Sequence, residues 1–319
     1  MKLIVSGLRA LGGYVSREFY QIMTDLIAHH DWRQIETWEL WNARGSLPDY
    51  LLNCFGALPH VILFWEGYEF VCARLAEIDR LDCRKAILAD DLHWWNEAMR
   101  LRKLIAFGVC DTVLSTYAYN WDRFYPELAG IKKPEWVPHS AAPEFMLAYN
   151  PHPENSILLS GVIDTHYPLR EQMKQLQTQG CYAIKHHPHP GYHYSFDHLT
   201  DTNVGRAYAE IINKHRVGFT DSGVYQYVVA KYFEIPATGA LLLADDAVRA
   251  PLKELGFIEN VHYFAVSSEN CEEQVRYVLD ESNREELDEI RRCGQQLVWE
   301  KHKTSDRARR IDEICARAN

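Results

Sequence analysis

The amino-acid sequence predicts an α/β protein with two doubly wound, Rossmann-like domains that face a cleft. Short β-rich runs alternate with longer amphipathic stretches from one end of the chain to the other, which is typical of parallel α/β architecture. One proline-rich stretch interrupts this alternation, which then restarts. The 319 residues suit two domains of ordinary size. A cleft between two such halves is the expected ligand site.

In the first half of the chain, β-rich runs predict five strands, and amphipathic stretches between them predict helices. The expected strands are Lys2–Ser6, Ile35–Leu40, Val61–Trp65, Lys85–Ala89 and Thr112–Ser115. The expected helices are Val15–His29, Phe70–Leu81 and Trp94–Ala106. The pattern stops between residues 132 and 155, which hold five of the chain's 13 prolines. Because dense proline favours extended connectors, we expect domains at 1–150 and 151–319, with the last helix packing back on the first domain.

The second half repeats the alternation. Its expected strands are Ser156–Ser160, Tyr182–Lys185, Val217–Thr220, Ala240–Ala244 and His262–Val266. Its expected helices are Leu169–Gln177, Val204–Lys214, Val224–Glu234, Ala247–Leu255 and Glu272–Leu279. The highly charged tail from Arg284 to Ala318 is expected to be a solvated helix. Ligand-binding residues should follow the carboxyl ends of the strands in each half.

The composition argues against several functional classes. Basic residues number 34 and acidic residues 44, a formal net charge of −10, whereas proteins that grip nucleic acid usually carry the opposite sign. The eight cysteines form no CxxC pair, which argues against a zinc ribbon and a disulfide-stapled secreted domain. No apolar run approaches the ~20 residues that span a bilayer. We therefore expect a cytoplasmic protein with no signal peptide, no transmembrane segment and no nucleic-acid partner.

The segment from Val217 to Asp246 carries most of the functional information. Asp221, Ser222 and Gly223 form an expected turn, with Ser222 capping a helix that starts at Val224. The free backbone N–H groups at such a start, over Ser222, Gly223, Val224 and Tyr225, would bind a phosphate or diphosphate. Lys231 and Glu234 share a helix face, where lysine would meet phosphate charge and glutamate the hydroxyls of a sugar. The alternative is an ordinary capped helix with an intrahelical ion pair.

Four sequence stretches resemble GT-B-type glycosyltransferases, most closely their spore-maturation-protein-like branch (glycosyl transferases group 1). They are KYFEIPATGALLLADD (231–246), SILLSGVIDTHYPLREQM (156–173), WVPHSAAPEF (136–145) and DDLHWW (90–95). The resemblance implies transfer of a sugar from a nucleotide-diphospho-sugar to an acceptor hydroxyl, with Glu234 at the nucleotide ribose and Lys231 near the diphosphate. It also implies that no metal and no cofactor is needed. Many relatives carry a second glutamate where this chain has Gln226, which leaves the contact to the donor sugar open.

A histidine-rich stretch, IKHHPHPGYHYSFDH (184–198), follows another strand. Lys185 and His186 are predicted to contact the donor phosphates or base, because they lie at the carboxyl end of a strand of the second domain. Imidazoles are also common metal ligands, so a metal site is an alternative. A polar surface loop is the third interpretation.

On the first domain, DDLHWW follows the strand that ends at Ala89. Asp91 and His93 are the predicted catalytic residues, since an acid or imidazole there could take the proton of an acceptor hydroxyl. The alternative is that an aspartate merely caps the following helix. Tryptophans of the first half, including Trp38 and Trp41, would stack on sugar rings or simply fill the core. Glu66 and Glu69 follow another strand and are weaker candidates for acceptor contacts.

Two other functions remain open at this point. A nucleotide-sugar epimerase would need acid and base groups around one sugar and no acceptor site. A non-catalytic sugar or nucleotide binder would bind the donor without consuming it. Whether the anomeric configuration is retained or inverted is also open, and only an inverting enzyme requires a base such as Asp91 or His93.

Overall fold

The computed structural model describes residues 1–317, and contacts along the chain divide it into two units. The first unit consists of residues 1–12, 19–138 and the C-terminal stretch from residue 305. The second consists of residues 13–18 and 139–304. Each unit has its own sheet and core, so each is described by itself.

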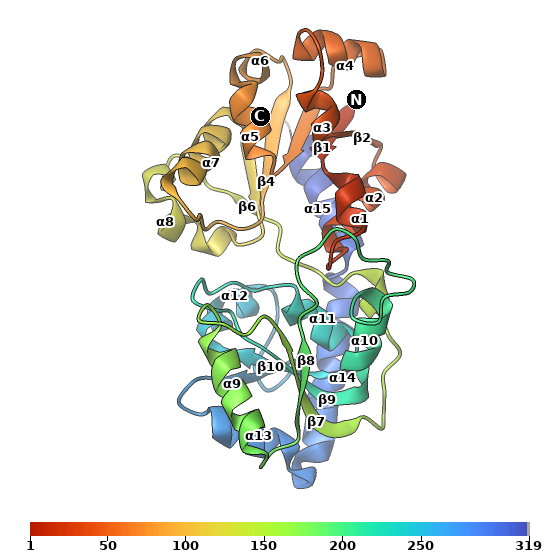
Figure 1. The fold of residues 1–319 in the computed structure, drawn as a ribbon, viewed down its shortest axis with the longest axis vertical. Coiled ribbons are helices and arrows are strands. Elements are labelled where there is room, and N and C mark those ends of the chain that lie inside the picture. Colours follow the sequence, from red (N-terminus) through yellow and green to blue (C-terminus); the bar gives the residue numbers. More distant parts are fainter. Residues whose placement is uncertain (318–319) are drawn as a thin grey trace. The chain divides into compact units, whose positions relative to one another are not determined.

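The sheet of the first unit has six parallel strands in the order β2-β1-β3-β4-β5-β6 (Figure 1). Every residue of β3 is buried, because helices cover both faces of the sheet. The carboxyl ends of these parallel strands lie at one edge, which is where the candidate residues of this unit follow. The strands are β1 (Lys2–Ser6), β2 (Trp32–Glu36), β3 (Val61–Trp65), β4 (Arg84–Ala89), β5 (Thr112–Ser115) and β6 (Glu135–Trp136).

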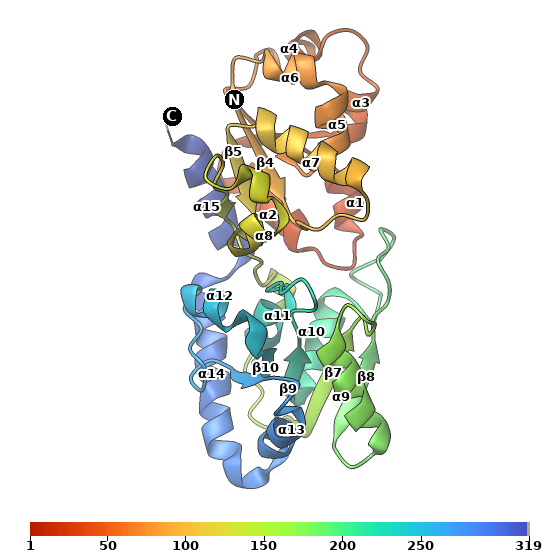
Figure 2. The same ribbon diagram turned by 90° about the vertical axis from the view of Figure 1, so that its left-hand side faces the viewer.

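Helices α2 and α15 pack on one face of this sheet, where Ile22, Leu26, Ile311 and Ile314 join the strands in one core. Helix α7 lies against β4 and runs in front of the strands in Figure 2. The helices of the unit are α1 (Leu8–Gly12), α2 (Glu18–His29), α3 (Thr37–Trp41), α4 (Leu47–Phe55), α5 (Tyr68–Ala73), α6 (Leu75–Asp79), α7 (Glu97–Val109), α8 (Trp121–Phe124) and α15 (Thr304–Ala316).

The sheet of the second unit has five parallel strands in the order β11-β10-β9-β7-β8. Its strands are β7 (Glu154–Gly161), β8 (Ile184–Pro188), β9 (His215–Thr220), β10 (Leu241–Asp245) and β11 (Phe264–Val266). Its helices are α9 (Pro168–Gln179), α10 (Gly205–Lys214), α11 (Lys231–Ala237), α12 (Arg249–Glu254), α13 (Cys271–Leu279) and α14 (Arg284–Lys301). Two parallel-stranded α/β units confirm the predicted fold class.

Two predicted elements are wrong, and in both cases contacts with a distant part of the chain contribute to the difference. The strand expected at Ile35–Leu40 lies earlier, at Trp32–Glu36, because β1 pairs with it from Lys2–Trp32 to Ser6–Glu36. The following residues form α3. The helix expected from Val224 begins only at Lys231. Gly223 and Gln226 adopt positive φ angles of 62° and 57°, which no helix accommodates, and β-branched and aromatic residues between them and Lys231 disfavour a helix.

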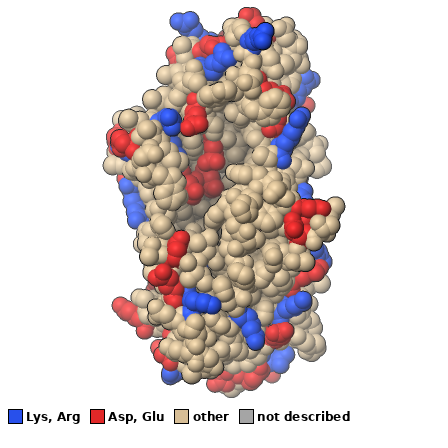
Figure 3. Space-filling model, in the orientation of Figure 1, with Lys and Arg blue, Asp and Glu red and all other residues tan. Residues whose placement is uncertain are grey.

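The charged tail is helical, as predicted, but it forms two helices and is not merely solvated. Helix α14 buries Leu287 and Ile290 in the core of the second unit, and α15 belongs to the first unit. Ala318, the last residue of the predicted helix, lies outside the described residues. Positive and negative side chains are interspersed on the face that Figure 3 draws. Within residues 1–317, no helix combines the length and the hydrophobicity that crossing a membrane requires.

Candidate active site

Two basic side chains meet at the carboxyl end of β7 in the second unit. A Cβ atom added to Gly161, the last residue of β7, would lie 2.8 Å from Nη1 of Arg170 and 3.3 Å from Cε of Lys231. Gly161 also has a φ of 102°, in the region that favours glycine. A residue without a side chain at this point therefore lets an arginine from α9 and a lysine from α11 approach the same stretch of backbone.

Arg170 is held in place by buried partners. Its Nε lies 2.9 Å from Oδ1 of Asp221, and its backbone N–H donates to Oδ2 of the same aspartate at 3.2 Å. The guanidinium also donates to the carbonyl oxygen of Val162 and lies 3.9 Å from the ring centroid of Tyr167. Burial raises the pKa of Asp221 to about 6, although Arg170 opposes this shift. The arginine is thus preorganised, since ion pair, carbonyl and ring fix its direction.

Lys231 is half-buried at the first residue of α11, above the ring of Tyr208 at 5.2 Å. Burial alone would lower the pKa of Lys231, but Tyr208 and Glu234 outweigh it, so the pKa is raised. The hydroxyl of Tyr208 lies 2.7 Å from that of Ser160 in β7. Lysine at this position therefore stays charged next to the end of β7.

Glu234 follows Lys231 by one helical turn, as its spacing predicts, and its residue is only 6% exposed. Burial raises the pKa of its carboxyl group to about 7, and Glu18 and Glu144 add to the rise while Lys231 and His139 oppose it. Within the described part of the chain, its carboxylate accepts no hydrogen bond. A buried acceptor pair of this kind has unused capacity for hydroxyl donors.

Two histidines that the sequence interpretation passed over lie beside Lys231. The ring of His187 stacks on that of Tyr208 at 5.6 Å, and its Nε2 is buried without a hydrogen-bond partner among the described residues. Burial, Lys231 and Arg170 together lower the pKa of His189 to about 4, so this ring is neutral near pH 7. Neutral imidazoles leave the positive charge of the site to Arg170 and Lys231.

Lys185 and His186, which the sequence also predicts to contact the donor, do not lie with Arg170 and Lys231. Lys185 and His186 are exposed on the edge strand β8, where His186 faces Lys174 on α9 at 3.4 Å. Side chains alternate along a strand, so the one-residue step from His186 to His187 changes the face of the sheet. The sequence predicts His186, whereas the structure places the next residue, His187, beside Lys231.

The expected phosphate site at a helix start does not form, because the turn after β9 is followed by irregular backbone until α11. Ser222 caps no helix, since its hydroxyl and backbone N–H both bond Oδ2 of Asp245, at 2.5 and 3.1 Å. A Cβ atom on Gly223 would lie 2.6 Å from the carbonyl oxygen of His166, which accepts from the N–H of Val224 at 2.8 Å. The ring of Tyr225 stacks near that of His166, at 6.0 Å. This turn is therefore packed against residues 166–167.

In the first unit, the loop after β4 is fixed from behind. Lys103 of α7 is 1% exposed, and its Nζ donates to the carbonyl oxygens of Asp91 and His93 at 2.5 and 2.9 Å. The Tyr125 hydroxyl donates to the carbonyl oxygen of Leu92 at 2.8 Å. Nδ1 of His93 lies 3.7 Å from Oδ1 of Asp91. The predicted catalytic pair is thus brought together, on a backbone that is anchored by buried groups.

The alternative that an aspartate caps the next helix is wrong. Helix α7 begins at Glu97, and its cap is Asn96, whose side chain accepts from the N–H of Met99 at 2.9 Å. Asp91 lies five residues before that cap. Its side chain is left for interactions other than helix capping.

Glu66 joins this group at the end of β3 and was only a weak candidate from the sequence. Burial raises the pKa of its carboxyl group to about 8, and the charges of Asp90 and Asp91 raise it further while Lys103 lowers it. Its φ of 57° places it in the left-handed region, an uncommon conformation for a glutamate. Near pH 7 this side chain is mostly protonated and is a hydrogen-bond donor beside two aspartates.

Among residues 1–317, no three His, Cys, Asp or Glu side chains converge in a way that could hold a metal ion. This includes the histidine-rich stretch 184–198, for which a metal site was an alternative.

Residues 183–313 match the family model described as glycosyl transferase-like. No curated protein sequence matches the chain significantly. Among solved structures, the chain is similar to sucrose-phosphate synthase (tll1590) from Thermosynechococcus elongatus, with 10% identity, a TM-score of 0.66 and 98% of each chain covered. It is also similar to alpha-glucosyltransferase in complex with UDP-glucose and DNA containing an abasic site, with 12% identity, a TM-score of 0.61 and coverage of 99% of this chain and 100% of the other. Anabaena Alr3699/HepE, solved with UDP and glucose, is 10% identical with a TM-score of 0.60 and full coverage of both chains.

The similar structures confirm the predicted GT-B-type fold over the whole chain, and the family match over residues 183–313 supports the glycosyltransferase class predicted from the sequence. They support a transferase acting by glycosyl transfer. The spore-maturation-protein-like branch stays a prediction.

Replacing Gly161 with alanine should weaken, at least tenfold, the binding of any anion that Arg170 and Lys231 hold. It should also destabilise the protein by about 1–3 kcal/mol, the cost of holding a non-glycine residue in a disfavoured conformation. The added methyl group would also displace Arg170 or Lys231. Calorimetric titration with UDP measures the affinity. Gly180→Ala is the matched control, because Gly180 has a φ of 74° with open space around it. Equal UDP affinity in both variants would show that the cations do not need Gly161.

Proposed function

We propose that this protein transfers a sugar from a nucleotide-diphospho-sugar to an acceptor hydroxyl, with the donor held by Arg170, Lys231 and Glu234 of the second unit. The observation that carries the proposal is the convergence of Arg170 and Lys231 on Gly161, one helical turn from the buried carboxylate of Glu234. Two fixed cations suit a diphosphate without a metal, and a carboxylate suits the two hydroxyls of a ribose.

UDP is the first nucleotide to test, because two of the similar structures hold UDP or UDP-glucose. The buried Nε2 of His187, beside Lys231, is a further group that a bound donor would reach. The turn at Ser222, Gly223, Val224 and Tyr225 and the pair Lys185 and His186 are retained as secondary candidates for the donor. They require that the donor extends beyond the two cations.

In the first unit we assign acceptor activation to the loop after β4. Asp91 and His93 lie 3.7 Å apart and would take the acceptor proton in an inverting reaction. Glu66, mostly protonated near pH 7, would donate a hydrogen bond to an acceptor oxygen. In a retaining reaction the same groups would only orient the acceptor, as positioning counts for much of the rate in such transfers.

The decisive experiment is a thermal-shift and hydrolysis screen of the full chain against nucleotides and nucleotide sugars. We expect stabilisation by a nucleoside diphosphate, slow release of that diphosphate from one donor sugar, and loss of both in Glu234→Ala. EDTA should leave binding intact. The absence of a response to any nucleotide would contradict the proposal. Binding without consumption would identify a binder, and interconversion of epimers without release of the diphosphate would identify an epimerase.

The affinity for a UDP-sugar should fall about tenfold between pH 8 and pH 6, because the ribose hydroxyls need an ionised acceptor and the pKa of Glu234 is about 7. The diphosphate of the UDP-sugar does not titrate in this range. The sign for stability is opposite: a carboxyl pKa raised from 4.5 to about 7 in the fold costs stability as the pH rises through that window. Calorimetric titrations at several pH values measure the affinity, and urea denaturation at the same pH values measures the stability. Glu234→Gln should show weak affinity with no pH dependence. A tenfold fall that persists in this variant would assign the titration to another group.

A further inference from the structure

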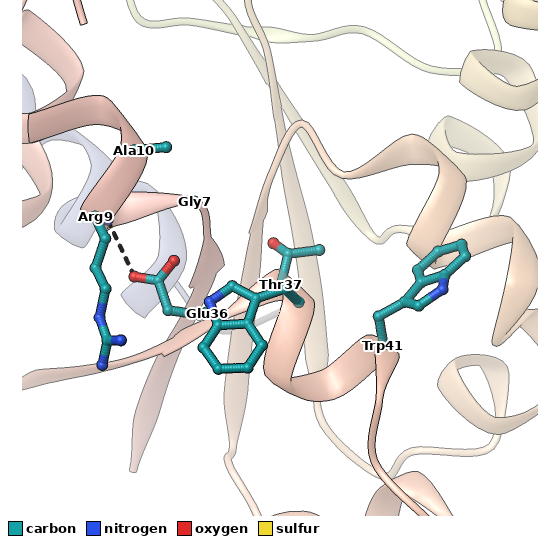
Figure 4. Close-up of a pocket in the computed structure, with 7 residues that line it drawn as sticks. Gly7, Arg9, Ala10, Glu36, Thr37 and Trp41 are labelled. Carbon is teal, nitrogen blue, oxygen red and sulfur yellow. Dashed lines mark hydrogen bonds between the residues drawn. The ribbon is translucent and has the colours of Figure 1, made fainter. Parts of the chain in front are cut away.

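A pocket in the first unit lies apart from the loop after β4. It has a volume of about 500 Å³ and opens between α1 and α3, at the carboxyl ends of β1 and β2. Figure 4 shows Arg9 and Ala10 on one side, Thr37 and Trp41 on the other, and the carboxylate of Glu36 between them. Trp38 also lines it. The volume falls within the range of ordinary small-molecule sites.

Glu36 is one of three polar residues that line this pocket, with Arg9 and Thr37, and it is only 4% exposed. One oxygen, Oε1, accepts from the backbone N–H of Arg9 and from Nε2 of Gln34, both at 3.1 Å. Within residues 1–317, no hydrogen bond reaches the other oxygen, Oε2. Figure 4 draws only the bond to Arg9. A desolvated carboxylate is costly unless its lone pairs are used, so the pocket favours a ligand that brings hydroxyl or amide donors.

Two tryptophans make up the apolar part of the pocket. Trp38 and Trp41 are 55% and 50% exposed, although tryptophan is usually well buried. Both tryptophans lie in α3, which forms where the sequence predicts the end of β2. The helix places the two indoles three residues apart. Exposed aromatic faces next to a hydrogen-bond acceptor suit a ring that is apolar on one face and carries hydroxyls at its edge.

We infer that this pocket binds a pyranose unit of the acceptor, so that the acceptor is a carbohydrate. The inference rests on the proposed glycosyl transfer and narrows its acceptor. An aliphatic chain would cover the tryptophans but leave the charge of Glu36 unpaired. A phosphate group would be attracted by Arg9 but repelled by the Glu36 carboxylate, and for a cation the two signs are reversed, so the pair of charges favours neither ion. A neutral, hydroxyl-bearing ring satisfies each of these groups.

The test is calorimetric titration of the nucleotide-free full chain with methyl glycosides and disaccharides of glucose, galactose, mannose and N-acetylglucosamine. Choline and a short alkyl alcohol serve as the cationic and aliphatic probes. We expect saturable binding of at least one saccharide, accompanied by quenching of tryptophan fluorescence. Affinity should fall at least tenfold in Glu36→Gln, which keeps both indoles, and in Trp41→Ala. Trp41→Phe should restore part of it.

Glu313→Gln is the matched control, because Glu313 is an exposed glutamate of α15 in the same unit that pairs with Arg309 and does not line the pocket. Circular dichroism of each variant verifies its fold. No binding of any saccharide, undiminished binding in Glu36→Gln, or binding of choline or the alcohol alone would overturn the inference. Because nucleotide is absent, these results are independent of the UDP screen, whose failure would speak only against the donor site.

Discussion

Replacing Lys231 with alanine should lower the rate of diphosphate release from the donor sugar about 100- to 1,000-fold, the usual loss when one group that stabilises developing charge is removed. Lys231 is half-buried, stays charged through Tyr208 and Glu234, and lies with Arg170 around Gly161. Negative charge grows on the leaving diphosphate during transfer, so the lysine should act mainly on the transition state. Steady-state assays of nucleotide release at saturating donor measure the effect on kcat.

Lys214→Ala is the control for this variant, because Lys214 is exposed in the last turn of α10 in the same unit. It changes the net charge by the same amount. An equally large loss of rate in Lys214→Ala would show that the net charge of the protein, and not the position of Lys231, causes the effect. A change of KM alone in Lys231→Ala would mean that the lysine binds the ground state and the transition state equally.

Replacing Arg291 with leucine should destabilise the second unit by about 3–5 kcal/mol, the usual cost of breaking a buried ion pair from one side. Arg291 is 1% exposed in α14. It donates to the carbonyl oxygens of Gly239 and Asn150, both at 2.9 Å, and pairs with Asp288 at 2.6 Å. Leucine would leave two carbonyls and a carboxylate without their donor. Urea denaturation followed by fluorescence measures the change in the free energy of unfolding.

Arg292→Leu provides the comparison one residue away. Arg292 also lies over the ring of Tyr149, at 5.1 Å, but its side chain is 54% exposed and it pairs only at 3.6 Å with Glu289. Exposed ion pairs contribute little to stability, so this change should cost less than about 1 kcal/mol. Unfolding of the two variants at the same urea concentration would contradict this prediction. It would mean that the hydrogen bonds of Arg291 to residues 150 and 239 contribute little to stability.

The strands were predictable where burial alone decides them. Runs such as VILFW at β3 are apolar throughout because both faces of a parallel sheet are covered, and the sequence shows this directly. The end of β2 could not be predicted from burial, because the register of this strand depends on its pairing with β1. The helix expected at Val224 failed for a similar reason: the left-handed turn at Gly223 and Gln226 is stabilised by contacts with residue 166, far away in the sequence.

In the candidate site too, the features that depend on nearby residues were predictable and those that depend on distant residues were not. Lys231 and Glu234 were predictable because one helix holds both at a fixed spacing. Arg170 lies 61 positions before Lys231, and only the path of the chain after β7 brings the two together. On β8, the face of the sheet decides between His186 and His187, and no local pattern reveals that face. Glu66 stands next to a predicted strand end, but its raised pKa comes first from burial and then from the charges of Asp90 and Asp91, which follow another strand.

Assignment of α15 to the first unit and of residues 13–18 to the second makes the polypeptide pass between the units at four points, after Gly12, Glu18, Pro138 and Thr304. No single cut therefore releases an intact half. A fragment that ends at residue 138 loses Ile311 and Ile314 from its core, and one that begins at residue 139 loses Glu18, which accepts hydrogen bonds from the backbone and hydroxyl of Ser140. A fragment for binding studies that keeps either unit intact therefore has to include segments from both sides of the boundary at Pro138.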